Sequence, residues 1–165
     1  MNMRMKKRFK AIVALLLCAA LTLSFGSYVY AEEDEEVVQE IDEVTLNKAK
    51  VAVVCQQLGF EKHTDVCIAV MMAESGGHSD ARNGNCIGPF QINYKVWGDA
   101  AQKIGADLET TDGNIAFGVW VLKCKYETYW DWTQALNSYN GKKGSLKEST
   151  NYTKKILKEV TECRK

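Results

Sequence analysis

The sequence predicts an all-α domain with little or no β-sheet. Apolar residues recur at helical spacing along most of residues 45–163, and no segment shows a sustained period-two alternation bounded by hairpin turns. The single proline, Pro89, falls in a stretch rich in Gly and Asn, so no predicted helix is interrupted by one. The length of 165 residues is sufficient for one globular domain with its own core.

Residues 1–31 have the pattern of a secretory signal. Residues 1–10 contain five basic residues and no acidic one, and residues 11–25 are an apolar run interrupted only by Thr22 and Ser24. The small residue Ala31 follows at a suitable place for cleavage. The run is shorter than the roughly 20 apolar residues that span a bilayer. We therefore expect a secreted, extracellular or cell-wall-associated protein that has no membrane anchor after cleavage.

The charge of the chain is unevenly distributed. Residues 32–43 contain eight acidic residues and no aromatic one, which predicts a disordered acidic leader. The predicted domain, residues 44–165, has 16 basic and 13 acidic residues. This mild positive charge would favour an anionic polymer, but no nucleic-acid-binding motif is present. We expect no nucleic-acid partner.

Five cysteines follow the predicted signal. An exported chain with this many thiols is expected to form at least one disulfide, and Cys55 with Cys163 is our first choice because both lie on apolar helix faces. A zinc site is disfavoured, since there is no CxxC pair and His63 and His78 are not at ligand spacing with the cysteines. We predict neither a metal nor another cofactor.

The first two helices are bounded by recognisable signals. Residues 45–58 have a helical pattern, and Gly59 is placed to end that helix in a left-handed conformation. Thr64 is expected to cap the next helix, whose end is marked by Gly76 and Gly77.

Four more segments complete the predicted fold. Residues 78–88 form a loop and residues 93–104 form a helix, although Gly98 weakens it. Asp112 is expected to cap a long helix, and Asp131 a short one over residues 132–139. The terminal helix carries one apolar face, made of Tyr152, Ile156, Val160 and Cys163.

Glu74 is the strongest candidate for a catalytic residue. Eight uncharged residues, 66–73, precede it, so it is expected at the end of a buried helix. Burial raises the pKa of a carboxyl group because it disfavours the charged form, and a general acid at neutral pH needs such an environment. The alternative interpretation is a glutamate at a helix end that points into solvent.

The motifs around Glu74 resemble a known family. Four groups follow one another at the spacing of that family: Glu74-Ser75-Gly76, Gly88-Pro89-Phe90-Gln91-Ile92, Asn114-Ile115 with Gly118 and Leu122, and Ala135-Leu136-Asn137-Ser138-Tyr139-Asn140-Gly141. They resemble the lysozyme-like catalytic domain of soluble lytic transglycosylases, which is related to goose-type lysozyme. The resemblance covers about residues 46–160. It implies a monomeric enzyme that cleaves peptidoglycan glycan strands between N-acetylmuramic acid and N-acetylglucosamine.

The resemblance also assigns roles to individual residues. Glu74 matches the catalytic acid/base, and Ser75 the hydroxyl residue that follows it. Gln91 matches the glutamine of the sugar cleft, and Tyr139, with Asn140 beside it, matches a tyrosine close to the catalytic carboxyl. A phenol hydroxyl can orient a protonated carboxyl, and amide side chains can hydrogen-bond an acetamido group. Tyr139 as an ordinary core aromatic and Ser75 as a mere helix-end residue remain alternatives.

Two departures from the family pattern concern the shape of the cleft. The family more often has Leu-Met where this chain has Pro89 and Phe90, and we expect Phe90 to offer a flat face to a sugar ring. The segment after Asn140 carries Lys142 and Lys143, which could reach carboxylates of the wall polymer.

The mechanism depends on whether a second carboxylate is present. No acidic residue lies between Asp80 and Asp99, although this segment should line the cleft opposite Glu74. This favours the single-carboxylate route that the family implies, which forms a 1,6-anhydromuramic product. If Asp80 or Asp99 activates water, the protein is instead a hydrolytic muramidase. A further alternative is a non-catalytic wall-binding or accessory module of a secretion or conjugation apparatus.

Overall fold

The computed structural model describes residues 41–142 and 148–164. The predicted signal and most of the predicted leader lie outside them. The described residues form six α-helices, one 3-10 turn and three short strands: α2 (Glu43–Leu58), η1 (Glu61–His63), α3 (Thr64–Ser75), β1 (Arg82–Asn83), β2 (Cys86–Ile87), β3 (Ile92–Asn93), α4 (Tyr94–Ile104), α5 (Thr111–Tyr129), α6 (Trp132–Tyr139) and α7 (Asn151–Cys163). The prediction of an all-α fold with little sheet is confirmed.

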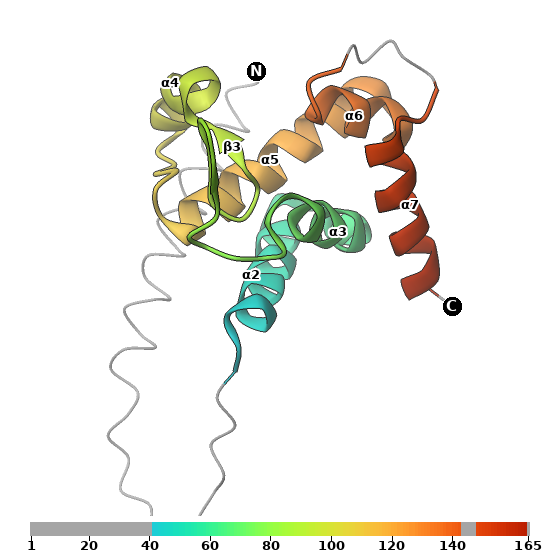
Figure 1. The fold of residues 1–165 in the computed structure, drawn as a ribbon, viewed down its shortest axis with the longest axis horizontal. Coiled ribbons are helices and arrows are strands. Elements are labelled where there is room, and N and C mark those ends of the chain that lie inside the picture. Colours follow the sequence, from blue (N-terminus) through green and yellow to red (C-terminus); the bar gives the residue numbers. More distant parts are fainter. Residues whose placement is uncertain (1–40, 143–147, 165) are drawn as a thin grey trace, which may run out of the picture.

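Helix α5 runs through the middle of the molecule (Figure 1). The strands and α4 lie towards its N-terminal end, α6 and α7 towards its C-terminal end, and α2 and α3 along one side (Figure 1). Residues 113–122 of α5 are all buried, which explains why that part of the helix is apolar apart from Asn114. Neither α5 nor any other described helix is both long and apolar enough to cross a membrane.

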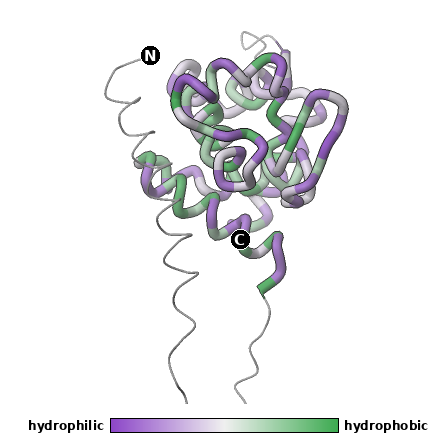
Figure 2. Tube along the Cα trace, turned by 90° about the vertical axis from the view of Figure 1, so that its left-hand side faces the viewer, coloured by the Kyte–Doolittle hydropathy of each residue, from purple (hydrophilic) through white to green (hydrophobic). Residues whose placement is uncertain are grey.

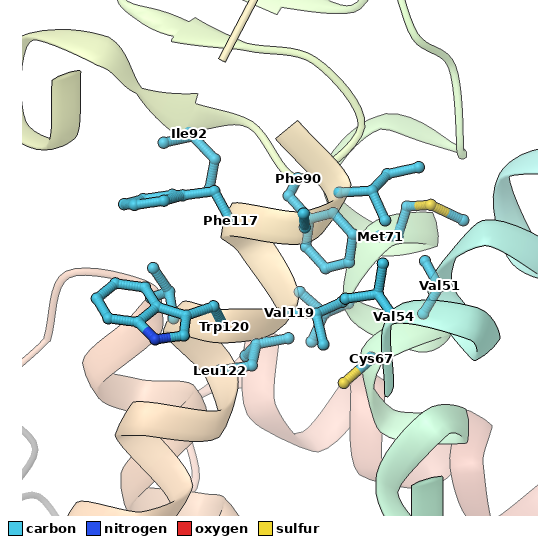
Figure 3. Close-up of a cluster of buried hydrophobic side chains, with 14 of the residues drawn as sticks. Val51, Val54, Cys67, Met71, Phe90, Ile92, Phe117, Val119, Trp120 and Leu122 are labelled. Atoms are coloured by element: carbon cyan, nitrogen blue, oxygen red, sulfur yellow. The ribbon is translucent and has the colours of Figure 1, made fainter. Parts of the chain in front are cut away.

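The core contains side chains from all six described helices, and the part drawn in Figure 3 joins α2, α3 and α5 to the segment from Phe90 to Ile92. Phe90, from the loop between β2 and β3, is completely buried and packs on Gly118 of α5. A Cβ atom at position 118 would lie 2.3 Å from Cγ of Phe90, so only glycine allows this close packing. Elsewhere hydrophilic and hydrophobic segments alternate along the helices (Figure 2), as expected for helices with one inward face.

The segment predicted as a loop, residues 78–88, contains the first two strands of a small antiparallel sheet. The strand order is β1-β2-β3, and Cys86 of β2 pairs with Asn83 on one side and Asn93 on the other. Each strand has two residues. Such short strands leave no period-two signal in the sequence, which is why the pattern did not predict them.

Three helices begin differently from the predictions. Thr64 is the first residue of α3 and does not cap it, because its hydroxyl donates a hydrogen bond of 2.9 Å to the carbonyl of Glu61. Asp42 caps α2 by accepting a hydrogen bond of 3.0 Å from the backbone N–H of Thr45, so the described fold includes the last residues assigned to the leader. Thr110, rather than Asp112, caps α5, and Asp112 forms an ion pair of 2.8 Å with Lys50. The prediction for Asp131, which caps α6, is confirmed.

The cysteines do not pair as expected. All five described cysteines are free thiols, so the predicted bond between Cys55 and Cys163 is wrong for this structure. Cys55 is completely buried and interacts with the thiol of Cys67 in the neighbouring helix α3, whereas Cys163 is exposed at the end of α7. Burial also raises the pKa of the Cys67 thiol well above its ordinary value. The apolar pattern of the two helices predicted an inner face for both residues, which is wrong for the exposed Cys163, and it carried no information on which helices are neighbours.

Candidate active site

A cavity of about 420 Å³ opens between the end of α3, the β2–β3 segment, α4, α5 and the end of α6. Four of the residues singled out from the sequence line it, namely Glu74, Gln91, Tyr139 and Asn140. They come from segments separated by up to 66 positions in the chain, and the fold brings them to one place.

Glu74 lies in the last turn of α3, which ends at Gly76 in a left-handed conformation with φ +68°. Burial raises the pKa of its carboxyl group above the ordinary value of 4.5. The hydroxyl of Tyr152 donates a hydrogen bond of 2.6 Å to Oε1 of Glu74, and this bond acts in the opposite direction by favouring the ionised form. Glu74 is therefore a half-buried carboxyl, fixed by one phenol, whose proton is held more tightly than in water.

Tyr152 reaches Glu74 from the first turn of α7. The next residue, Thr153, is completely buried and donates a hydrogen bond of 2.7 Å to Oδ1 of Asn137 in α6. Asn137 in turn donates to the carbonyl of Glu148, 3.0 Å away, just before α7. These two bonds join the start of α7 to α6 and so determine where the phenol of Tyr152 lies.

Tyr139, at the end of α6, has a different partner from the one expected. Its hydroxyl donates a hydrogen bond of 2.8 Å to the backbone carbonyl of Phe90, whereas the phenol bonded to Glu74 belongs to Tyr152. Burial, followed by the nearby charge of Glu74, raises the pKa of Tyr139 well above its ordinary value. Tyr139 thus lies near the carboxyl, as the resemblance implied, but it holds the β2–β3 loop.

Ser75 also connects α3 to that loop. Its hydroxyl donates a hydrogen bond of 2.8 Å to the carbonyl of Pro89 and accepts one of 3.0 Å from the N–H of Gly77. Its side chain is not part of the cavity wall. The geometry therefore gives Ser75 a supporting position behind Glu74 rather than a place against a bound sugar.

The expectation that Phe90 offers a flat face to a sugar ring is wrong. The side chain is completely buried in the core against Gly118 and is not part of the cavity wall. The sequence alone did not show that the side chain of Phe90 turns into the core. The part of Phe90 next to the site is its backbone carbonyl, held by Tyr139.

Gln91 lines the cavity with a strained backbone, at φ +45°. Its Nε2 group donates hydrogen bonds of 3.0 Å each to the carbonyls of Ala81 and Gly88. Because both partners are acceptors, they fix the orientation of the amide and use both of its donors. The amide oxygen is left to accept a hydrogen bond from a ligand such as the N–H of an acetamido group.

The side chain of Asn114 of α5 also holds the β2–β3 loop, by hydrogen bonds to its backbone. Its Oδ1 accepts a hydrogen bond of 3.0 Å from the N–H of Phe90, and its Nδ2 donates to the carbonyls of Ile87 and Leu108 at 2.8 and 3.3 Å. The side chain is completely buried. Gly88 passes so close to it that an added Cβ would lie 2.5 Å from the amide, which explains the glycine before Pro89.

Asn140, which was predicted from the sequence, lines the cavity and is exposed. Two further residues of the wall, Trp97 of α4 and Lys125 of α5, were not singled out from the sequence. Tyr152 was interpreted only as part of an apolar helix face. The hydroxyl group of Tyr152 on an otherwise apolar face was the one indication of a polar contact. Nothing in the sequence indicated that its partner, Glu74, lies 78 residues away.

The two candidate second carboxylates lie elsewhere. Asp80 and Asp99 are exposed and neither lines the cavity, so Glu74 is the one carboxylate among the described residues of its wall. The described part of the chain also contains no group of three or more His, Cys, Asp or Glu side chains that could hold a metal ion.

Comparison with known proteins agrees with this geometry. The family model described as "Transglycosylase SLT domain" matches residues 56–161, which include Glu74 and Tyr152 and span well over half of the chain. No curated protein and no solved structure gives a significant match. The members of this family are lytic transglycosylases, enzymes that act on peptidoglycan. The chain, with the half-buried Glu74 in the last turn of α3, belongs to the SLT transglycosylase family.

Proposed function

We propose that this protein cleaves the bond between N-acetylmuramic acid and N-acetylglucosamine with Glu74 as its single acid/base, and releases a 1,6-anhydromuramic product. The observation that carries the proposal is that Glu74 is the one carboxylate among the described residues of the cavity wall, with a pKa raised by burial. Membership of the SLT family supports the substrate and the type of reaction.

In the first step the protonated Glu74 donates its proton to the glycosidic oxygen. The bond from that oxygen to C1 of the muramic residue breaks, and the N-acetylglucosamine part leaves as an alcohol. The developing positive charge at C1 is shared with the carbonyl oxygen of the substrate's own acetamido group, which takes the place of a second carboxylate. The amide oxygen of Gln91 is positioned to accept the N–H of an acetamido group within the cleft.

In the second step the ionised Glu74 takes the proton of the C6 hydroxyl, and the C6 oxygen forms a bond to C1. The enzyme regains its proton and no water is consumed. Tyr152 donates its hydrogen bond to the carboxylate between the two steps, when the negative charge is present, and so stabilises the ionised form. A buried carboxyl that both gives and takes a proton at near-neutral pH fits this cycle.

Mass spectrometry of digested peptidoglycan tests the proposal. Anhydro products are expected, and products that are heavier by one water molecule would instead assign the protein as a hydrolytic muramidase. Intact wall material after prolonged incubation with folded protein would favour the non-catalytic, wall-binding alternative.

Export of the protein is part of the proposal, because its substrate lies outside the cytoplasmic membrane. The support is the basic start and apolar run of residues 1–31. Expression of the full chain and of a chain without residues 2–31, followed by cell fractionation, tests it. Retention of both forms inside the cell would contradict export.

A further inference from the structure

We propose that Lys125 is a specificity-determining residue that binds a carboxylate of the peptide attached to the glycan strand. This inference rests on the proposed function and deepens it, because it concerns which strands the cleft accepts.

Lys125 lies on the wall of the cavity that contains Glu74. It comes from α5, one turn after Val121, which lines the same cavity. Its ammonium group lies 5.9 Å from the centre of the Trp97 ring, and Trp97 is also part of the wall. The lysine is half-buried, so part of its side chain is open to the cavity that it lines.

Lys125 has no carboxylate partner among the residues that the structure describes, unlike two other lysines. Other lysines pair with carboxylates: Lys50 with Asp112 at 2.8 Å and Lys123 with Glu127 within α5. Among the described residues no carboxylate forms an ion pair with Lys125. A ring face attracts an ammonium more weakly than a carboxylate does, so Lys125 can still bind an anionic ligand.

Lys125 and Glu74 line the same cavity, but no ion pair joins them among the described residues. The phenol of Tyr152, and not the lysine, donates the hydrogen bond to the carboxyl group of Glu74.

The chemistry of the substrate identifies what this lysine can recognise. In an intact strand the lactyl carboxyl of muramic acid is tied up in the amide bond to the peptide, so the negative charges of the strand are the free carboxylates of the peptides. The ammonium of Lys125 therefore distinguishes a strand whose peptide carboxylates are free from one in which they are amidated. Desolvated charge pairs of this kind act mainly on affinity and selectivity rather than on the chemical step.

The test compares Lys125→Gln with Lys123→Gln, a matched change two residues earlier on α5, where the lysine pairs with Glu127 and does not line the cavity. Each is assayed on intact peptidoglycan and on the same peptidoglycan after its peptide carboxylates have been converted to amides. Lys125→Gln should raise KM on the intact wall roughly five- to tenfold, with kcat within about twofold and no change on the amidated wall. Lys123→Gln should leave KM unchanged on both, and Lys125→Arg should retain most of the preference.

A binding measurement separates this inference from the proposed function. Calorimetry with a soluble disaccharide that bears the peptide with free carboxylates, and with the same ligand after amidation of those carboxylates, needs no turnover. A preference for the free carboxylates that is lost in Lys125→Gln supports the role of Lys125 even if no product is formed. Equal affinity of the parent for both ligands, or equal weakening of both by the substitution, would overturn it.

Discussion

The end of α6 and the start of α7 each bring a tyrosine hydroxyl to the candidate active site, but the two hydroxyls have different acceptors. Tyr152 donates to the side chain of Glu74 at 2.6 Å, and Tyr139 donates to the backbone carbonyl of Phe90 at 2.8 Å. The carboxyl changes its charge during the proposed reaction, whereas the carbonyl does not. The role of a tyrosine near the candidate glutamate therefore follows from the group that accepts its hydrogen bond. Its distance from the site does not distinguish a role in the reaction from a role in holding the loop.

The largest effect is expected from Glu74→Gln, which removes the group that makes Tyr152 different from Tyr139. Wall cleavage should fall at least roughly a hundredfold, because an amide cannot donate the proton that general acid catalysis requires. Turbidity loss of purified walls measures the rate. Asp80→Asn and Asp99→Asn are matched controls, since both side chains are exposed outside the cavity, and they should cleave like the parent. Near-parent activity of the Glu74 variant would remove it from the mechanism.

Tyr152→Phe should lower kcat roughly tenfold with little change in melting temperature. A hydrogen bond to a charged group contributes about 1.5 kcal/mol or more, and 1.4 kcal/mol corresponds to about tenfold in rate. Because the bond lowers the pKa of Glu74, its loss should also move the basic limb of the kcat/KM profile to higher pH. A pH–rate profile measures both. An unchanged basic limb would show that the phenol does not act on the carboxyl.

Tyr139→Phe should give the reverse pattern. The variant keeps the ring but leaves the carbonyl of completely buried Phe90 without this hydrogen bond, which should cost about 1 to 3 kcal/mol in the free energy of unfolding. Denaturant unfolding measures this loss. The pH–rate profile should keep the shape of the parent, because the Glu74–Tyr152 bond is intact. A shifted basic limb, or parent-like stability with lost turnover, would give Tyr139 a direct part in the chemistry.

The smallest effect concerns the stability of the Glu74→Gln variant as a function of pH. Below the ordinary carboxyl pKa of 4.5, Glu74 is protonated in both the folded and the unfolded chain. As the pH rises towards the raised folded value, the unfolded chain loses its proton first, so the parent loses stability and the glutamine variant does not. Melting temperatures at pH 4 and pH 8 should show the variant gaining on the parent at the higher pH. A difference that does not depend on pH would contradict the burial of Glu74.

Much of the fold and part of the site could be predicted from the sequence, for local reasons. Helix ends are determined by nearby residues such as Gly59 and Asp131. The uncharged residues before Glu74 predicted that its carboxyl group is at least partly buried. The acceptors of the two tyrosines could not be predicted, because each is set by how α6 and α7 pack on parts of the chain far away in sequence. The prediction for Phe90 was wrong for the same reason, because the space for its ring in the core exists only where Gly118 of α5 packs against it.

Asn114 has a consequence for the thermodynamics of substrate binding. One buried side chain holds the backbone at Ile87, Phe90 and Leu108, and so the loop that carries Gln91 loses its conformational freedom when the protein folds. Little further ordering of this wall is then required when a glycan arrives. The free and the occupied enzyme should have nearly the same backbone here, so the entropy lost on binding is mainly that of the sugar chain itself.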